Sequence, residues 1–324
     1  MKQTIYKMEI IDGSNESLKK LDYLILSSGS DARAYGVLSK CTTINTTVNI
    51  NHVILFNFIE RLKDLNASDS LFNYKQFDYN SLHEIFCEIR NPSSCLEELV
   101  KNSFNNNSRI GIDISCLTKP YFYFIIKLLK ERFQVEKLSA FYTEPKSYSF
   151  PKGLFSAFRT SSGPLSIIEI PGYSGQESRG AKRKLIILLG FDGDLSKEIN
   201  EDVSPYENDI IVVNGFPSYT SKLKDISLIA NEKLVSDQNI NVAYARANNP
   251  FEIYNLLSQI KSQEQPNTFI NIAPLGSKPM ALGACLFALH NPDVRIVYPL
   301  PDIYENKYSD SSWISWIYEL PLTN

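Results

Sequence analysis

Short runs of β-branched and other apolar residues alternate along this chain with longer stretches of helical character. Strands that alternate with helices in this way form βαβ units with parallel strands. The runs are continuously apolar, which predicts that helices cover both faces of the sheets. Nine such runs occur, at residues 23–28, 52–57, 109–115, 137–143, 184–189, 209–214, 241–245, 268–273 and 294–299.

The residues that punctuate this pattern occur twice, in the same order. Three pairs of segments match: Gly29-Ser-Asp31 with Gly190-Phe-Asp192, Asp113 to Pro120 with Asn271 to Pro279, and Tyr142-Thr-Glu-Pro145 with Tyr298-Pro-Leu-Pro301. Gly29 lies 90 positions before Lys119, and Gly190 lies 88 before Lys278. We predict an α/β protein of two Rossmann-like, three-layer halves with mostly parallel sheets, related by internal duplication. The alternative is that unrelated βαβ domains share such spacing, because their crossovers have similar lengths.

The length of 324 residues exceeds one typical domain and fits two. We expect a first Rossmann-like domain at residues 1–150, a connector at 151–182 and a second Rossmann-like domain at 183–324. The connector contains one strand-like run, Ser166 to Ile170, which we expect at a sheet edge or in a hairpin. The aromatic segment Trp313 to Tyr318 is expected to seal the second domain as a C-terminal strap, and an amphipathic helix is expected around Leu82 to Ile89.

Composition excludes several classes of protein. A net charge of −3 argues against a long nucleic-acid groove, and no apolar run is long enough to span a membrane. The N-terminus has no apolar signal core, and the five scattered cysteines form no C-x-x-C pair, so we expect a cytoplasmic protein with reduced thiols. None of the three histidines is spaced i, i+4, so we predict no metal site.

The loop before the apolar segment Met280 to Leu289 is the strongest candidate for ligand binding. Gly276 would let the backbone approach a ligand, Ser277 would cap the helix, and Lys278 would add a positive charge at a helix start that already favours anions. The glycine-to-lysine spacing is not that of a Walker A loop. The structural alternative is a capped, buried helix whose lysine extends along its surface.

Three further loops complete the predicted site. The equivalent loop of the first half, with Thr118 and Lys119, lacks the glycine. The loops after the first strand of each half contribute Ser28, Gly29, Asp31 and Arg33, and Gly190, Asp192 and Asp194. An arginine fits phosphate bidentately, and aspartates can bind ribose hydroxyls, a base edge or Mg²⁺, although an aspartate is also a common helix N-cap. Neither loop is G-x-G-x-x-G, which disfavours a dinucleotide cofactor.

Catalytic candidates are carboxylates at strand ends. Asp31, Asp113, Asp192 and Glu144 follow or end predicted strands and could act as acids or bases, with Mg²⁺ if the protein is an enzyme; no other cofactor is predicted. There is no G-x-S-x-G elbow. Cys116, just before Lys119, could be a thiolate at a helix start, but a buried spectator is the favoured interpretation.

The segment Gly276-Ser-Lys-Pro-Met-Ala-Leu-Gly283, between one strand and the last, resembles the late signature of CRISPR-associated Rossmann-fold (CARF) domains. The resemblance implies that Gly276, Ser277 and Lys278 contact nucleotide phosphates and that the loop after the first strand forms the other wall. In that family two domains hold a cyclic oligonucleotide about a two-fold axis. Here the two halves of one chain would form a pseudo-dimer.

The expected function is therefore nucleotide sensing. The chain would bind a small nucleotide, such as a cyclic oligonucleotide, as a subunit of a bacterial defence or stress-response system. No nuclease or helix-turn-helix segment is apparent, which leaves three options: a binding subunit for a separate effector, an enzyme that degrades the ligand, or a protein that sequesters it. A homodimer is also compatible with the sequence. The alternative is a nucleotide-processing enzyme, a phosphodiesterase or N-glycoside hydrolase that uses the strand-end carboxylates, and a scaffold with degenerate pockets is a third interpretation.

Overall fold

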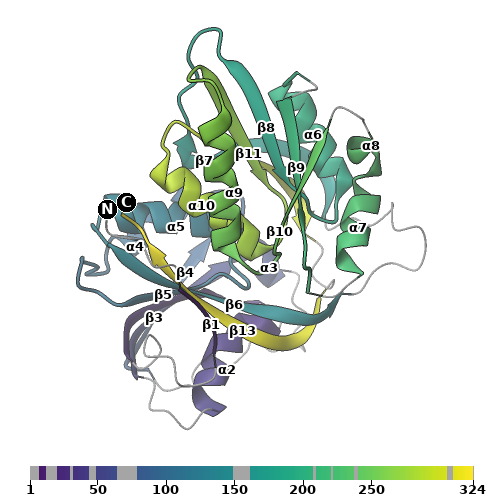
Figure 1. Ribbon diagram of the computed structural model, residues 1–324. Coiled ribbons are helices and arrows are strands. Elements are labelled where there is room, and N and C mark those ends of the chain that lie inside the picture. The colour runs from purple at the N-terminus through teal and green to yellow at the C-terminus, as the bar shows by residue number, and fades with distance from the viewer. Residues whose placement is uncertain are drawn as a thin grey trace. The chain divides into compact units, whose positions relative to one another are not determined.

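The chain folds into two α/β units, each built on one mostly parallel sheet (Figure 1). The computed structural model describes residues 7–11, 20–29, 32–43, 49–63, 79–148, 161–206, 209–219, 222–236, 240–304 and 309–323. Unit 1 consists of Met1–Ser149 and Ser309–Asn324, and unit 2 of Phe150–Tyr308. The predicted fold class is thereby confirmed. No helix in these described ranges is long and apolar enough to cross a membrane.

Unit 1 contains a seven-stranded sheet in the order β1-β13-β6-β5-β2-β3-β4. Strands β2 to β6 are parallel to their neighbours among themselves, while β13 is antiparallel to both β6 and β1. Its elements are β1 (Lys7–Ile10), β2 (Lys20–Ser27), η1 (Ala32–Tyr35), α2 (Gly36–Thr43), β3 (Asn49–Phe58), α3 (Ile59–Lys63), β4 (Ser81–Cys87), η3 (Pro92–Cys95), α4 (Leu96–Leu99), β5 (Ile110–Asp113), α5 (Lys119–Glu131), β6 (Lys137–Tyr148) and β13 (Ser309–Pro321).

Apolar side chains cover both faces of the unit 1 sheet, as the continuous apolar runs predict. On one face Leu24 of β2 and Leu55 of β3 share a buried cluster with Val37 of α2. Phe58 of β3 lies on the other face, where its ring meets Tyr121 of α5 edge-on at 4.8 Å between centroids. The helices α2 and α5 therefore sandwich the sheet in three layers.

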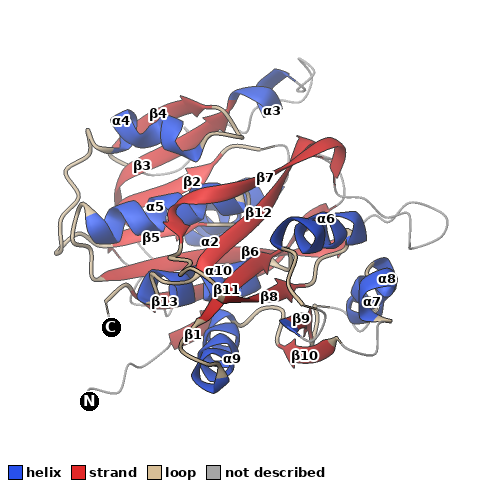
Figure 2. Ribbon diagram, turned by 90° about the horizontal axis from the view of Figure 1, so that it is seen from above, coloured by secondary structure: helices blue, strands red, loops and turns tan. Residues whose placement is uncertain are grey.

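Unit 2 contains a six-stranded sheet in the order β10-β9-β8-β11-β12-β7, and β7 is its one antiparallel strand. Figure 2 shows α6, α7 and α8 on one side of this sheet and α9 and α10 on the other. Its elements are β7 (Ser161–Ser174), β8 (Lys182–Leu188), α6 (Gly193–Val203), β9 (Ile210–Gly215), α7 (Leu223–Ala230), α8 (Glu232–Val235), β10 (Asn241–Ala245), α9 (Pro250–Gln263), β11 (Thr268–Pro274), α10 (Lys278–His290) and β12 (Arg295–Tyr304).

Apart from β1, the two sheets have the same strand order, and the strand pairing allows their residues to be compared position by position. Ile25 of β2 pairs with Ile112 of β5, and Ile186 of β8 pairs with Ile272 of β11. Gly29 and Gly190 thus follow their strands at the same register, as the repeat predicts. Common ancestry of the halves remains a prediction.

The same register corrects one predicted match. Asp113 follows Ile112 and therefore corresponds to Ala273, whereas Asn271 lies in the middle of β11 opposite Leu185 and Arg295. The predicted equivalence of Asp113 and Asn271 is wrong, because the segment from the strand to the lysine is one residue longer in the first half.

The antiparallel strands next to β6 and β12 are exchanged between the units. In chain order β7 follows β6 and β13 follows β12, yet Tyr148 of β6 pairs with Ser309 of β13, and Tyr304 of β12 pairs with Ser161 of β7. The antiparallel strand of unit 2, β7, therefore follows the last parallel strand of unit 1 in the sequence, and the antiparallel strand β13 of unit 1 follows the last parallel strand of unit 2.

This exchange changes the expected domain boundaries. The aromatic segment expected to strap residues 183–324 lies in β13, within the unit 1 sheet, and the expected connector supplies β7, whose central part is the predicted edge run. Either sheet offers the same row of backbone donors and acceptors, so the apolar pattern of a strand does not reveal which sheet it joins.

The segment expected to be an amphipathic helix at Leu82 to Ile89 contains strand β4, which pairs in parallel with β3. Ile85, Cys87 and Ile89 are buried while Phe86 is exposed, so the apolar pattern has a period of two. His83, expected in a helix, therefore lies in a strand.

Candidate functional site

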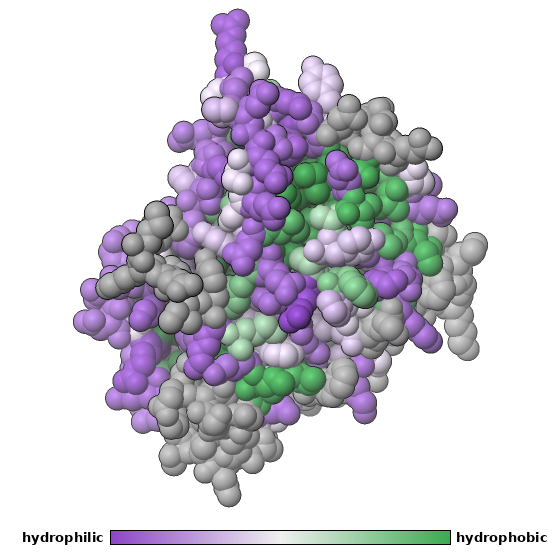
Figure 3. All heavy atoms as spheres, in the orientation of Figure 1, coloured by the Kyte–Doolittle hydropathy of each residue, from purple (hydrophilic) through white to green (hydrophobic). Residues whose placement is uncertain are grey.

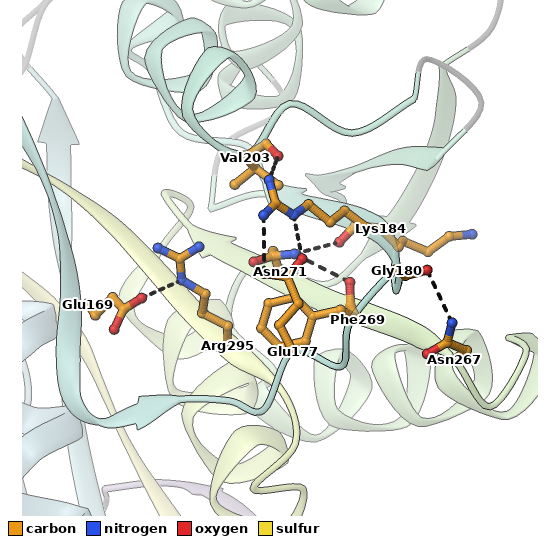
Figure 4. Close-up of polar contacts among 10 residues, drawn as sticks. Glu169, Glu177, Gly180, Lys184, Val203, Asn267, Phe269, Asn271 and Arg295 are labelled. Carbon is orange, nitrogen blue, oxygen red and sulfur yellow. Dashed lines mark hydrogen bonds and ion pairs between the residues drawn. The ribbon is translucent and has the colours of Figure 1, made fainter.

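The carboxyl edges of the two parallel sheets are the candidate binding regions, as is general for open α/β sheets. At the opposite, amino edge of the unit 2 sheet, charged groups have structural partners. Arg183 Nε lies 2.6 Å from Glu177 Oε1 and its Nη1 donates to Val203 O (Figure 4). Lys182 Nζ lies 2.6 Å from Asp209 Oδ1. These ion pairs hold the ends of strands and helices together.

At the carboxyl edge of unit 2, Ser277 occupies the N-cap of α10 as predicted. Its Oγ accepts a hydrogen bond from Met280 N at 3.3 Å and donates one to Ala247 O, in the loop after β10. The hydroxyl therefore already serves the helix and a neighbouring loop. Lys278, the first residue of α10, is half-buried at this helix start.

The two glycines of the predicted unit 2 site lie together and allow two loops to pack closely. A Cβ at Gly190 would lie 2.5 Å from Leu275 O, and one at Gly276 would lie 3.1 Å from Leu189 O. Asn231 Nδ2 and Ser227 Oγ each donate to Gly190 O at 3.0 Å. The loops after β8 and β11 thus lie against each other, as a ligand site formed by both loops requires. The close packing of the two loops is by itself sufficient to explain why glycine stands at both positions.

The acidic residues after β8 differ in environment. Asp192 is buried at the N-cap position of α6 but accepts no capping hydrogen bond from the helix. Asp194 is exposed in the first turn of that helix. Asp192 therefore stands at a helix start, as the N-cap interpretation predicts, but its side chain does not make the capping hydrogen bond.

In unit 1, two buried hydroxyls lack partners at the corresponding edge. Thr118, at the N-cap position of α5, is 5% exposed, and within the described ranges its Oγ1 neither caps the helix nor bonds to another group. Ser27, the last residue of β2, is 1% exposed, and its Oγ also has no hydrogen-bond partner in the described part of the chain. Since β2 and β5 are neighbouring strands, both hydroxyls belong to one edge. An unsatisfied buried hydroxyl costs about 1–3 kcal/mol, so packing does not account for them.

Two cationic side chains, Lys119 and Arg61, lie at or next to the same helix start. Lys119 is half-buried at the first position of α5. Arg61 of α3 donates from Nη1 to Cys116 O at 3.0 Å, in the loop that leads to α5. Arg61 is not among the residues expected from the sequence. The sequence feature that could have indicated it is its position, three residues after the buried end of β3. The predicted Arg33 is buried in η1, which follows β2.

The loop after β2 also contains the predicted site residues Ser28, Gly29 and Asp31. Ser28 is buried and its Oγ donates to Phe56 O at 3.3 Å. Gly29 is half-buried after β2. Asp31 lies outside the described residues.

The described catalytic candidates of unit 1 have structural partners. Asp113 Oδ1 accepts from Ser115 N at 2.8 Å, which fixes the turn after β5. Glu144, expected at the tip of a strand, lies inside β6, where its Oε1 accepts from Trp316 Nε1 at 2.6 Å. These two acids occupy neighbouring strands of unit 1, whereas Asp192 belongs to unit 2.

Within the described ranges, no group of three or more His, Cys, Asp or Glu side chains could hold a metal ion.

Cys116 is buried in the loop before α5. Burial raises the pKa of the Cys87 thiol to about 11, so this thiol is protonated at neutral pH.

Comparison with known proteins gives no relative: no protein-family model and no curated protein sequence matches this chain.

Proposed function

We propose that this chain is a nucleotide-sensing subunit that binds phosphate groups at the starts of α5 and α10. The observation that carries the proposal is a pair of buried hydroxyls, Ser27 at the end of β2 and Thr118 at the start of α5, that lack hydrogen-bond partners among the described residues. Phosphate oxygens accept hydrogen bonds from hydroxyls and helix-start amides, and Lys119 and Arg61 supply positive charge beside them. A bound phosphate would satisfy groups that the protein alone leaves unsatisfied.

The second site of the proposal is at the start of α10, where Lys278 follows the N-cap residue Ser277. Its support is the short resemblance of residues 276–283 to CARF domains and the meeting of the loops after β8 and β11. We assign the ligand to the class of small linear or cyclic nucleotides, and the response to a separate effector protein of a bacterial defence or stress system.

The hydrogen bonds of Asp113 and Glu144 favour binding over a nucleotide-processing enzyme. Each carboxylate already accepts a fixed protein donor, from Ser115 N and Trp316 Nε1. A general base needs to receive a proton from a substrate, so an oxygen that is committed to the fold is a poor candidate.

Calorimetry with linear and cyclic oligonucleotides tests the proposal. We expect one class to bind, and Lys119→Ala and Lys278→Ala each to weaken binding by about tenfold or more, because each removes a charge-assisted contact. Thr118→Val should weaken binding while leaving the free protein equally or more stable, since it removes an unsatisfied hydroxyl.

Lys197→Ala is the control, because Lys197 lies on α6 in an exposed ion pair with Glu201. Absence of binding by every nucleotide, or wild-type affinity in both lysine variants at the helix starts, would contradict the proposal.

A further inference from the structure

Unit 2 exposes a pair of aromatic side chains that contact each other. Phe216 is 48% exposed and Tyr244 is 53% exposed. Their ring centroids are 6.3 Å apart and their planes meet at 79°, an edge-to-face arrangement. Figure 3 shows apolar side chains at the surface on the face that carries β9 and α7 in Figure 1. Adjacent exposed aromatic rings of this size are typical of binding surfaces rather than of ordinary protein exterior.

The pair lies at the carboxyl edge of the sheet, where α10 begins. Phe216 directly follows the end of β9, and Tyr244 is the penultimate residue of β10. Phe216 N donates to Ala245 O at 2.7 Å, and Ala247 N donates to Pro217 O at 3.1 Å, so the two loops hold each other.

A chain of contacts joins the aromatic pair to the start of α10. Gly215, next to Phe216, packs so closely that a Cβ there would lie 3.3 Å from Met280 Sδ in the first turn of α10 and 3.0 Å from Ala247 Cβ. Ala247 O in turn accepts from Ser277 Oγ at the N-cap. The backbone that carries the aromatic pair is therefore connected to the start of α10 through Gly215 and Ala247, while the Phe216 ring itself lies beside Lys224 of α7.

We infer that Phe216 and Tyr244 form a stacking site for a nucleobase of the nucleotide whose phosphate binds at α10. The inference rests on the proposed function and adds to it the recognition of the base. A base has a flat face that stacks on aromatic rings without regard to sequence, and the anion site supplies only the phosphate end of such a ligand. Lys224 Nζ lies 6.0 Å from the centre of the Phe216 ring and is also paired with the carboxylate of Asp225, so both charges border this side of the aromatic pair.

Two probes that share a phosphate and differ in the base separate the two parts of the site. Adenosine 5′-monophosphate carries a base and ribose 5-phosphate does not. By calorimetry, we expect Phe216→Ala and Tyr244→Ala each to weaken binding of adenosine 5′-monophosphate by about five- to tenfold and to leave the affinity for ribose 5-phosphate unchanged. Tyr244→Phe keeps the ring and should retain wild-type affinity.

Tyr206→Ala is the matched control, because Tyr206 is 76% exposed elsewhere in unit 2. It should change neither affinity, and thermal unfolding of each variant should match that of the wild type. If Lys278→Ala weakens both probes while Phe216→Ala and Tyr244→Ala weaken neither, the stacking site is overturned and the phosphate site stands. If the wild type binds neither probe nor any longer nucleotide, both proposals fail. A change in sedimentation equilibrium without a change in nucleotide affinity would make the pair a protein contact and overturn the inference.

Discussion

At the scale of single residues, side chains that the sequence marks for chemistry have partners that the sequence does not reveal. Glu144 is the clearest example. Its partner Trp316 lies 172 positions away on β13, and the pair exists because β13 lies beside β6. A strand-end carboxylate and a tryptophan in a terminal segment are each recognisable in a sequence, but their contact depends on topology.

This contact gives the first residue-scale prediction. Trp316→Phe keeps the aromatic packing and removes the N–H that bonds to the buried Glu144, so we expect a loss of about 1–3 kcal/mol in the free energy of unfolding. Urea unfolding measures it. The double variant Trp316→Phe, Glu144→Gln should lose less than the sum of the single variants. Additive losses would show that the two side chains do not depend on each other.

The candidate site was only partly predictable at this scale. The sequence favours α10 over α5 because of Gly276, but in the structure that glycine accommodates Leu189 O from a neighbouring loop. The unsatisfied hydroxyls lie instead at Ser27 and Thr118. Residue type identifies which loops face the edge, whereas hydrogen-bond satisfaction depends on the folded surroundings.

At the scale of elements, the apolar runs predict the parallel strands well and the edges poorly. All nine predicted runs coincide with strands, within a few residues at their ends. The misassigned element, β4, is an edge strand whose buried residues alternate with exposed ones over a short distance, and a short pattern of this kind is easily taken for one face of a helix. Buried central strands carry the stronger signal because both of their faces are apolar.

Helix α10 offers an element-scale prediction in which two effects oppose each other. In an exposed helix, replacing glycine with alanine stabilises by about 0.5–1 kcal/mol. At Gly283, however, a Cβ would lie 2.2 Å from Pro250 O and 2.8 Å from Ile253 Cβ of α9, which are too close to accommodate without backbone movement. We therefore expect Gly283→Ala to destabilise unit 2 by about 1–3 kcal/mol.

Thermal unfolding of Gly283→Ala checks this sign. The matched control is Ser258→Ala on α9, where the hydroxyl bonds only to Tyr254 O within its own helix, and it should change stability little. A rise in the unfolding temperature of Gly283→Ala would mean that helix propensity outweighs the close packing of α9 and α10.

At the scale of the whole molecule, the exchange of β7 and β13 is the feature that sequence patterns could not supply. The repeated strand order follows from the alternation of strands and helices, but the identity of the antiparallel strand beside β6 or β12 does not. Both exchanged strands follow a long strand directly and could have formed a hairpin with it. In the structure each pairs with the equivalent strand of the other half. Unit 1 is thus completed by β13, which the whole of unit 2 separates from β6 in the sequence, and unit 2 begins with β7, which follows β6 of unit 1.

The exchange predicts where a local defect will act. Ile317 of β13 is fully buried and belongs to the core cluster of unit 1 with Leu24, Leu55 and Phe141. Ile170 of β7 is fully buried in unit 2. We expect Ile317→Ala and Ile170→Ala each to destabilise the unit that holds the strand by about 2–4 kcal/mol.

Hydrogen exchange followed by peptide mass analysis locates the effect in the full-length protein. Ile317→Ala should reduce protection in β2, β5 and β6, although residue 317 follows β12 in the chain, and Ile170→Ala should reduce protection in β8, β11 and β12. The expected domain bounds of 1–150 and 183–324 make the opposite prediction for Ile317, since they place it with β8 to β12. Loss of protection in β8 to β12 on Ile317→Ala, with β2 to β6 unchanged, would therefore refute the strand exchange.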